Sequence, residues 1–216
     1  MALFSDMALE DARAIIARYP PGRERSAIMP LLYLAQSIQG QISREGLQQV
    51  AEMLGIKTAE VEAVASFYTM YRLRPTGEHL VNICTNVACK LLGADDVYEA
   101  AHEAADMKHG QELSDDGKLT LHEEECLGVC EFAPAVQIDF VNHDNVTPER
   151  MRELIASLRE GVVPVPARGP AMKSFAHASR VLAGLPESQG DGPDKAPENE
   201  PENEPENEPA NGRVQA

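Results

Sequence analysis

Two cysteine-bearing segments decide the organisation of this chain: Ile83-Cys84-Thr85-Asn86-Val87-Ala88-Cys89-Lys90 and Glu125-Cys126-Leu127-Gly128-Val129-Cys130-Glu131. They contain the four cysteines of the sequence, arranged as a C-x4-C pair and a C-x3-C pair. Each pair follows a short apolar run, which predicts a β-strand. We therefore expect both pairs on loops that leave a sheet, where four thiolates can converge on one centre.

Three kinds of site can use four thiolates. Structural zinc accepts four cysteines, but its ligand pairs are usually closer in sequence. Two disulfides suit small secreted domains, whereas this chain is long, acidic and begins without the features of a secretory leader. A 2Fe–2S cluster takes two thiolates per iron and tolerates varied spacing, although the plant-type ferredoxin spacing does not occur here. The cysteine spacing alone therefore favours neither a zinc site nor an iron–sulfur cluster.

The residues around the cysteines carry a resemblance to a known family. The two patterns are Cys84-Thr85-Asn86-x-x-Cys89-x-Leu91-x-Gly93 and Glu125-Cys126-Leu127-Gly128-x-Cys130-x-x-Ala133-Pro134-x-Val136-Gln137-Ile138. Both resemble the thioredoxin-like 2Fe–2S ferredoxins, and within them the 24-kDa subunits of respiratory complex I, from about Tyr19 to about Gly161. The resemblance implies one 2Fe–2S cluster and no catalytic residue in this chain. It implies these ligands, one pair for each iron: Cys84 with Cys89, and Cys126 with Cys130.

The same resemblance implies an electron-transfer role within NADH:quinone oxidoreductase. The chain would dock on a flavoprotein subunit that binds NADH and FMN, among other subunits of the peripheral arm. The enzyme activity would belong to the assembly, because no Gly-x-Gly-x-x-Gly or P-loop motif occurs in this sequence. The equivalent diaphorase subunit of an NAD-linked hydrogenase or formate dehydrogenase shares the motifs and is the alternative. A zinc-stapled interaction module without a redox role is a further hypothesis.

Acidic residues surround the second cysteine pair: Glu123, Glu124, Glu125 and Glu131. A cluster on four thiolates is formally a dianion when oxidised and gains negative charge on reduction. The acidic residues would oppose that gain and keep the reduction potential low, whereas Lys90 would favour it. An ordinary solvated loop is the open alternative, since solvent screens exposed charges.

Composition bounds the partners and the compartment. The net charge of −16 makes nucleic acid an unsuitable partner. No apolar run is long enough to span a bilayer, so no direct membrane insertion is expected. We expect a protein of the bacterial cytoplasm, peripheral on the cytoplasmic side of the inner membrane through its complex.

The predicted fold class is α+β. Residues 1–74 are expected to form a small helical bundle, because apolar residues recur at helical spacing in four stretches. Ser43 and Thr58 can cap the third and fourth helices, while Gly40 and Gly55 can end the second and third.

Residues 75–161 are expected to form a thioredoxin-like α/β domain around the cysteines. Alternating patterns predict strands at 79–83, 119–122 and 136–140, and a turn at 142–145. Helical patterns predict a helix at 94–105 and a last one capped by Thr147.

The composition changes after the cysteine domain. Residues 162–190 are expected to form an extended arm, basic at Arg168, Lys173 and Arg180, that is either a solvated linker or docks on a partner. Residues 191–216 repeat Pro-Glu-Asn-Glu, and we expect them to be disordered because these residues cannot build a core.

Overall fold

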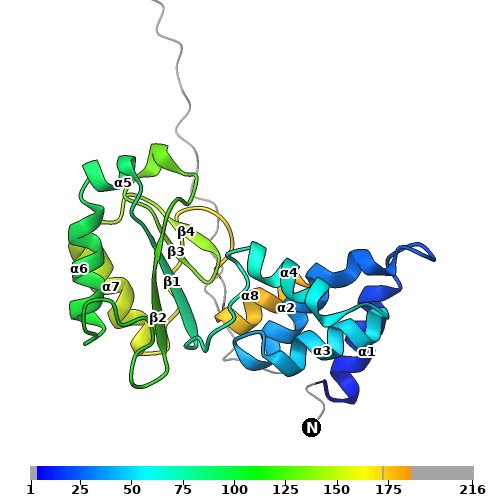
Figure 1. The fold of residues 1–216 in the computed structure, drawn as a ribbon. Helices are drawn as coiled ribbons and strands as arrows, with labels where there is room; N and C mark the ends of the chain where they lie inside the picture. Colours follow the sequence, from blue (N-terminus) through cyan, green and yellow to red (C-terminus); the bar gives the residue numbers. More distant parts are fainter. Residues whose placement is uncertain (1–3, 172, 186–216) are drawn as a thin grey trace, which may run out of the picture.

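The N-terminal part of the protein is a bundle of short helices. The computed structural model describes residues 4–171 and 173–185 (Figure 1). The bundle consists of α1 (Asp6–Ile16), the 3-10 turn η1 (Glu24–Ala27), α2 (Ile28–Gln39), α3 (Arg44–Leu54) and α4 (Thr58–Phe67). Its core is aliphatic, and side chains such as Ile15, Leu31 and Leu34 are completely buried. The helical part of the predicted α+β fold is confirmed.

The helix ends follow local chemistry. The Ser43 hydroxyl accepts a hydrogen bond from the Gly46 amide at 3.2 Å, as expected of an N-cap. Gly40 and Gly55 close α2 and α3 with φ of 68° and 63°, the left-handed conformation that glycine adopts without strain. The predicted capping role of Thr58 is wrong, because Thr58 is the first residue of α4 and Lys57 occupies the cap.

The second part of the protein is a four-stranded sheet. It contains β1 (His79–Cys84), β2 (Leu119–Glu124), β3 (Val136–Ile138) and β4 (Val141–His143) in the order β2-β1-β3-β4. β1 and β2 are parallel, whereas the other neighbouring pairs are antiparallel. A parallel pair needs a crossover, and here α5 (Val87–Leu91) and α6 (Ala94–Ala104) supply it.

The two faces of the sheet differ in chemistry. One face packs against α6 and α7 (Pro148–Arg159), which cover it side by side in Figure 1. The strand residues of that face share a continuous apolar surface: Val81, Ile83, Leu119, Leu121, Val136 and Ile138. The opposite face is polar. There the Asn82 amide donates to Gln137 at 3.2 Å, and Gln137 donates to Asn142 at 3.0 Å.

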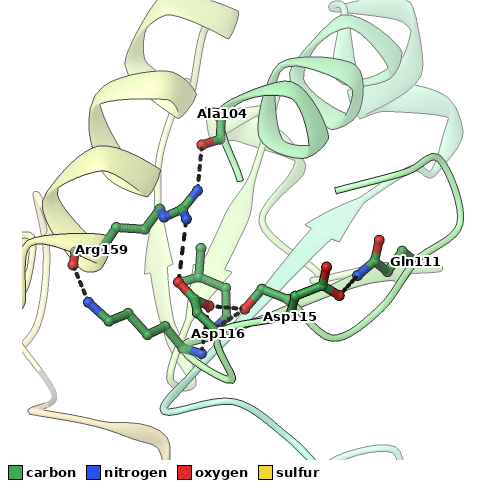
Figure 2. A network of polar contacts seen from close by, with 8 residues as sticks. Ala104, Gln111, Asp115, Asp116 and Arg159 are labelled. Carbon is green, nitrogen blue, oxygen red and sulfur yellow. Dashed lines mark hydrogen bonds and ion pairs between the residues drawn. The ribbon is translucent and has the colours of Figure 1, made fainter. Parts of the chain in front are cut away.

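A polar network fixes the start of β2 at the sheet edge remote from the cysteines (Figure 2). Arg159, the last residue of α7, donates to the Ala104 carbonyl at 3.5 Å and to Asp116 at 3.4 Å. Its own carbonyl accepts from Lys118 Nζ at 2.7 Å. The Ser114 hydroxyl donates to Asp116 at 2.6 Å and accepts from the Leu119 amide at 2.9 Å. The network joins α6, α7 and the turn before β2.

The turn between β3 and β4 lies earlier than predicted. Asp139 and Phe140 have φ of 48° and 68° and form the turn, so the predicted strand at 136–140 ends at Ile138. Asn142 and His143, expected in a turn, belong to β4. Tight hairpin turns of this conformation usually carry Asn-Gly or Asp-Gly, and Asp139-Phe140 lacks that signal. Tertiary contacts hold it instead: the buried Asp139 carboxylate accepts from the Leu80 amide at 2.9 Å and contacts His79 Nδ1 at 2.6 Å.

The segment after α7 differs from the extended conformation expected for 162–190. It contains a helix, α8 (Phe175–Leu182), which packs against α2 of the bundle. In Figure 1 the orange α8 lies beside α2, far in sequence but adjacent in space. Phe175 and Ser179 are completely or almost completely buried. The proposed docking of this arm on a partner stays a prediction, and the repeat at 191–216 lies outside the described residues.

One buried side chain joins three segments of the bundle. The Gln36 amide donates to the Met70 carbonyl at 3.2 Å and to the Ser179 hydroxyl at 3.1 Å. The side-chain oxygen Gln36 Oε1 accepts from the Arg72 backbone amide at 2.7 Å. Because Gln36 is completely buried, water cannot replace these bonds.

Replacing Gln36 by leucine should destabilise the protein strongly. The substitution leaves polar groups of residues 70, 72 and 179 without their partner, at about 1–3 kcal/mol for each group that stays unsatisfied. Urea unfolding measures the loss. Gln39→Leu is the matched control, because Gln39 is exposed on the same helix. Equal stability of the two variants would contradict the role assigned to Gln36.

Candidate metal centre

The pairing of β1 with β2 brings the two cysteine segments to the same edge of the sheet. Cys84, the last residue of β1, lies opposite Glu124, the last residue of β2. The Thr85 amide continues the pairing by donating to the Glu124 carbonyl at 3.0 Å. Since parallel strands end at the same edge, both loops leave the sheet side by side. Cys126 follows β2 by two residues.

The first cysteine pair is buried. The Cys84 amide donates to the Ala135 carbonyl at 3.1 Å, which fixes the end of β1. Cys89 lies on α5, the five-residue helix that the sequence patterns did not predict. The two thiols are 3% and 2% exposed and pack in a small cluster of alanines: Ala94, Ala133 and Ala135.

The second pair lies on an exposed loop. Cys126 and Cys130 are both exposed, and Cys130 begins the 3-10 turn η2 (Cys130–Phe132). Gly128 has φ of 72°, a conformation that a residue with a Cβ rarely adopts. This conformation directs the Gly128 amide toward Cys126 Sγ, to which it donates at 3.4 Å. An N–H donor at this distance stabilises negative charge on a sulfur.

The thiols of the two loops influence one another. Burial, together with smaller contributions from the neighbouring Cys84 and Cys130 thiols, raises the pKa of the Cys89 thiol to about 11. The first loop and Cys130 therefore lie close together. All four cysteines belong to the described part of the chain, and each is a free thiol. Within the described ranges, no three His, Cys, Asp or Glu side chains are grouped around a single metal position.

The donor set fits a 2Fe–2S group. Thiolate is the ligand that these clusters use, and the sequence supplies two cysteines on each of two adjacent loops. This division matches the group's need for one pair of thiolates at each iron. A buried thiol with a raised pKa stays protonated near neutral pH, so binding a metal there must displace protons.

Asn86 bridges the two cysteine loops. Its Nδ2 donates to the Glu125 carbonyl at 2.9 Å, directly before Cys126. Its Oδ1 accepts from the Val87 amide at 2.9 Å, at the start of the helix that carries Cys89. Asn86 belongs to the first motif, but nothing in the sequence assigned it this contact. An N-cap residue inside a ligand loop is the signal that could have drawn attention to it.

A polar cavity of about 210 Å³ lies next to the second loop, between the polar face of the sheet and the segment after α4. It is lined by Thr69, Met70, Asn82, Glu124, Cys126, Leu127, Gln137 and Phe140. Sequence patterns gave no indication of it, because its walls come from both parts of the protein.

Of the acidic residues predicted around the second pair, Glu123 and Glu124 end β2, Glu125 follows it directly, and Glu131 lies in η2. Lys90 does not counter them freely, since its ammonium group lies 3.4 Å from the Asp95 carboxylate. The lysine of the first motif is therefore already paired with a carboxylate outside the second loop.

Comparison with known proteins gives consistent matches. The family model described as thioredoxin-like 2Fe–2S ferredoxin matches residues 12–159. An NADH-quinone oxidoreductase subunit of Mycobacterium tuberculosis is 45% identical over 181 residues, which cover 84% of this chain and 71% of the relative. Its counterpart of the same name in Rickettsia bellii is 40% identical over 157 residues, covering 72% of this chain and 93% of the relative. NADH-quinone oxidoreductase subunit 2 of Thermus thermophilus is 38% identical over 146 residues, covering 67% and 80%.

A solved structure shares the fold. The NAD+-reducing NiFe-hydrogenase in its H2-reduced state matches with a TM-score of 0.55 at 20% identity. The match covers 62% of this chain and 22% of the hydrogenase chain. Among the described residues, no helix combines the length and the apolar content that crossing a bilayer requires.

Replacing Asn86 by alanine should loosen the site. The substitution removes the hydrogen bond that ties the first loop to the second, so a chelator should strip bound iron faster from the variant. The rate of loss of visible absorbance measures this. Asn142→Ala is the control, because it deletes a carboxamide contact of similar length elsewhere on the sheet. Equal release rates for the two variants would mean that the Asn86 bridge does not hold the loops.

Proposed function

The chain belongs to the thioredoxin-like 2Fe–2S ferredoxin family, and from this premise we propose that it is the iron–sulfur electron-transfer subunit of a respiratory NADH:quinone oxidoreductase, complex I. The relatives named as subunits of that oxidoreductase, matched over most of this chain, support the assignment. The structural observation that carries it is the meeting of two cysteine loops at one edge of the parallel β1–β2 pair.

The ligand assignment is part of the proposal. Cys84 and Cys89 hold one iron from the buried side, while Cys126 and Cys130 hold the other from the exposed side. When bound, the 2Fe–2S group supplies a one-electron carrier. The Gly128 amide stabilises negative charge on Cys126 Sγ, whereas the neighbouring glutamates oppose any added negative charge.

The flavin and the nicotinamide belong to a partner in this proposal. A hydride donor delivers two electrons together, whereas an iron–sulfur centre accepts one, so a flavin must stand between them. This chain has no recognisable nucleotide-binding loop. The NADH site and FMN are therefore assigned to a flavoprotein subunit of the same complex, and the chain itself lies at the cytoplasmic side of the inner membrane through that complex.

An exposed apolar patch next to the first pair supports the docking of a partner. The patch consists of Val87, Leu91 and Leu92, on α5 and directly after it, and their exposed fractions are 68%, 82% and 61%. Cys89 lies on the same short helix but is buried. Exposed apolar groups of this kind mark interaction sites. We assign the patch to the contact with the flavoprotein subunit.

The diaphorase subunit of an NAD-linked hydrogenase is the second candidate. The fold match to an NAD+-reducing hydrogenase favours keeping it, although that match concerns the fold alone. A formate dehydrogenase subunit falls in the same class. The subunits that co-purify with the native protein distinguish these complexes, because the hydrogenase or the formate dehydrogenase would bring its own catalytic subunit.

The isolated chain should contain two irons and two labile sulfides, and NADH should leave its visible spectrum unchanged. Dithionite should bleach it, since chemical reduction needs no nucleotide site. Adding the flavoprotein subunit should permit reduction by NADH, to an extent set by the potential. Stoichiometric zinc without sulfide would instead identify a zinc-stapled module. Bleaching of the flavin-free chain by NADH would show that it has a nucleotide site of its own.

Leu91→Glu should weaken binding to the flavoprotein subunit while leaving the iron content unchanged. The substitution puts a charge at the centre of the exposed patch, where association would have to desolvate it. Titration calorimetry with the flavoprotein subunit measures the affinity. Met7→Glu is the matched control, because Met7 is 74% exposed on α1 in the bundle. An affinity equal to that of the control would exclude the α5 patch from the interface.

A further inference from the structure

The segment that follows the family's matched span returns to the cysteine domain. Residues 162–171 and 173–185 lie after the matched residues 12–159 and run from the end of α7 past β4 to α8 (Figure 1). The Phe175 amide donates to the Glu78 carbonyl at 3.0 Å, directly before β1. The Phe175 ring also contacts Phe140 in the β3–β4 turn, with centroids 5.4 Å apart. Both contacts fix the segment at Phe175 against the cysteine domain.

Arg168, within this segment, makes a close polar contact with the turn after β4. Its Nε and Nη2 donate to the two carboxylate oxygens of Asp144 at 2.8 and 3.0 Å. The Asp144 side chain is only 8% exposed, whereas that of Arg168 is 51% exposed. Two parallel N–H···O bonds fix the orientation of the guanidinium plane as well as its position.

The same guanidinium covers the aromatic ring that ends the second cysteine loop. The Arg168 Cζ lies 3.9 Å from the centroid of Phe132, within the range of a cation–π contact. Phe132 is two residues after Cys130 and ends the same 3-10 turn. The Asn145 amide donates to the Phe132 carbonyl at 2.8 Å, which ties that turn to the residue next to Asp144.

Local backbone hydrogen bonds shape the turn that carries Cys130. Within the turn, Phe132 donates to Val129 at 3.0 Å and Ala133 donates to Cys130 at 3.4 Å, whereas the bond from Asn145 reaches it from farther along the chain. Neither Cys130 nor Glu131 is buried. A stacked guanidinium with a fixed partner can therefore decide where this turn lies.

We propose that Arg168 is a positioning residue for the Cys130 ligand loop, which it holds by clamping Phe132 against Asp144. The inference rests on the proposed function, because it takes Cys130 as a cluster ligand. The clamp needs the planar fork of arginine, since lysine offers a point charge that neither binds a carboxylate in two places nor stacks on a ring.

The test compares Arg168→Ala and Arg168→Lys with the unaltered iron-loaded chain. Both variants should release iron to a chelator about two- to fivefold faster, which corresponds to losing one exposed cation–π contact. Both should also broaden or shift the EPR signal of the reduced protein. Arg152→Ala is the control, because Arg152 is 48% exposed and pairs with Glu103 at 3.1 Å on the same domain. Its release rate should match that of the unaltered chain.

A second comparison tests the route of the effect. In a Phe132→Leu background the guanidinium has no ring to cover, so Arg168→Ala should accelerate iron release much less than it does alone. If Arg168→Lys released iron as slowly as the unaltered chain, a positive charge alone would suffice and the clamp would be overturned. Equal effects of Arg168→Ala with and without the Phe132 ring would overturn it as well.

Hydrogen exchange separates this inference from the proposed function. Arg168→Ala should speed amide exchange in a peptide covering residues 129–133, whether or not iron is bound, and leave residues 97–105 in α6 unchanged. If the unaltered chain carries no iron–sulfur group but the exchange effect appears, the function fails while the clamp stands. If the group is present and neither exchange nor iron release responds, the clamp fails and the function stands.

Discussion

Parallel pairing of β1 with β2 is the constraint on which the candidate centre depends. Hydrogen bonds align Cys84 with Glu124, so the loops that follow these residues start next to each other. A parallel pair also requires a crossover, and the crossover begins with the helix that carries Cys89. One strand pairing therefore places Cys84 at the end of β1 and Cys89 on the crossover helix. It also brings the loop with Cys126 and Cys130 next to them. The Asn86 bridge closes the arrangement across the gap between the loops.

The different chemistry of the two sheet faces explains how the rest of the chain is arranged. The apolar face is covered by α6 and α7, and the network around Arg159 holds these helices to the start of β2. The polar face remains for contacts with other segments. The chain beyond α7 then joins the two parts of the protein, since Phe175 packs on the β3–β4 turn while Ser179 bonds to Gln36 in the bundle. The bundle is thus attached to the sheet in two ways, by the chain that connects α4 to β1 and by α8, which returns to α2.

The asymmetry of burial shapes the chemistry of the centre. Cys89 is desolvated and its thiol has a raised pKa, so the protein stabilises a thiolate there only when a metal compensates the charge. Cys126 and Cys130 are exposed and depend instead on local donors and on contacts from distant segments, such as the Gly128 amide and the Arg168 guanidinium. The buried pair is thus held in place by packing. The exposed pair remains accessible to a partner and lies near carboxylates.

The amino-acid sequence by itself determined the features that depend on near neighbours. The four cysteines, the cap at Ser43, the stop at Gly55 and the start of α7 at Thr147 are all consequences of chemistry within a few residues. Only the tertiary structure decided the turn at Asp139, because a buried contact with His79 replaces the usual turn residues. It also decided α8, whose bond to Gln36 spans 143 positions, and the Arg168 contact, which spans 24. Side-chain bonds over such separations depend on how the chain folds back on itself, and no local pattern of polarity or spacing encodes them.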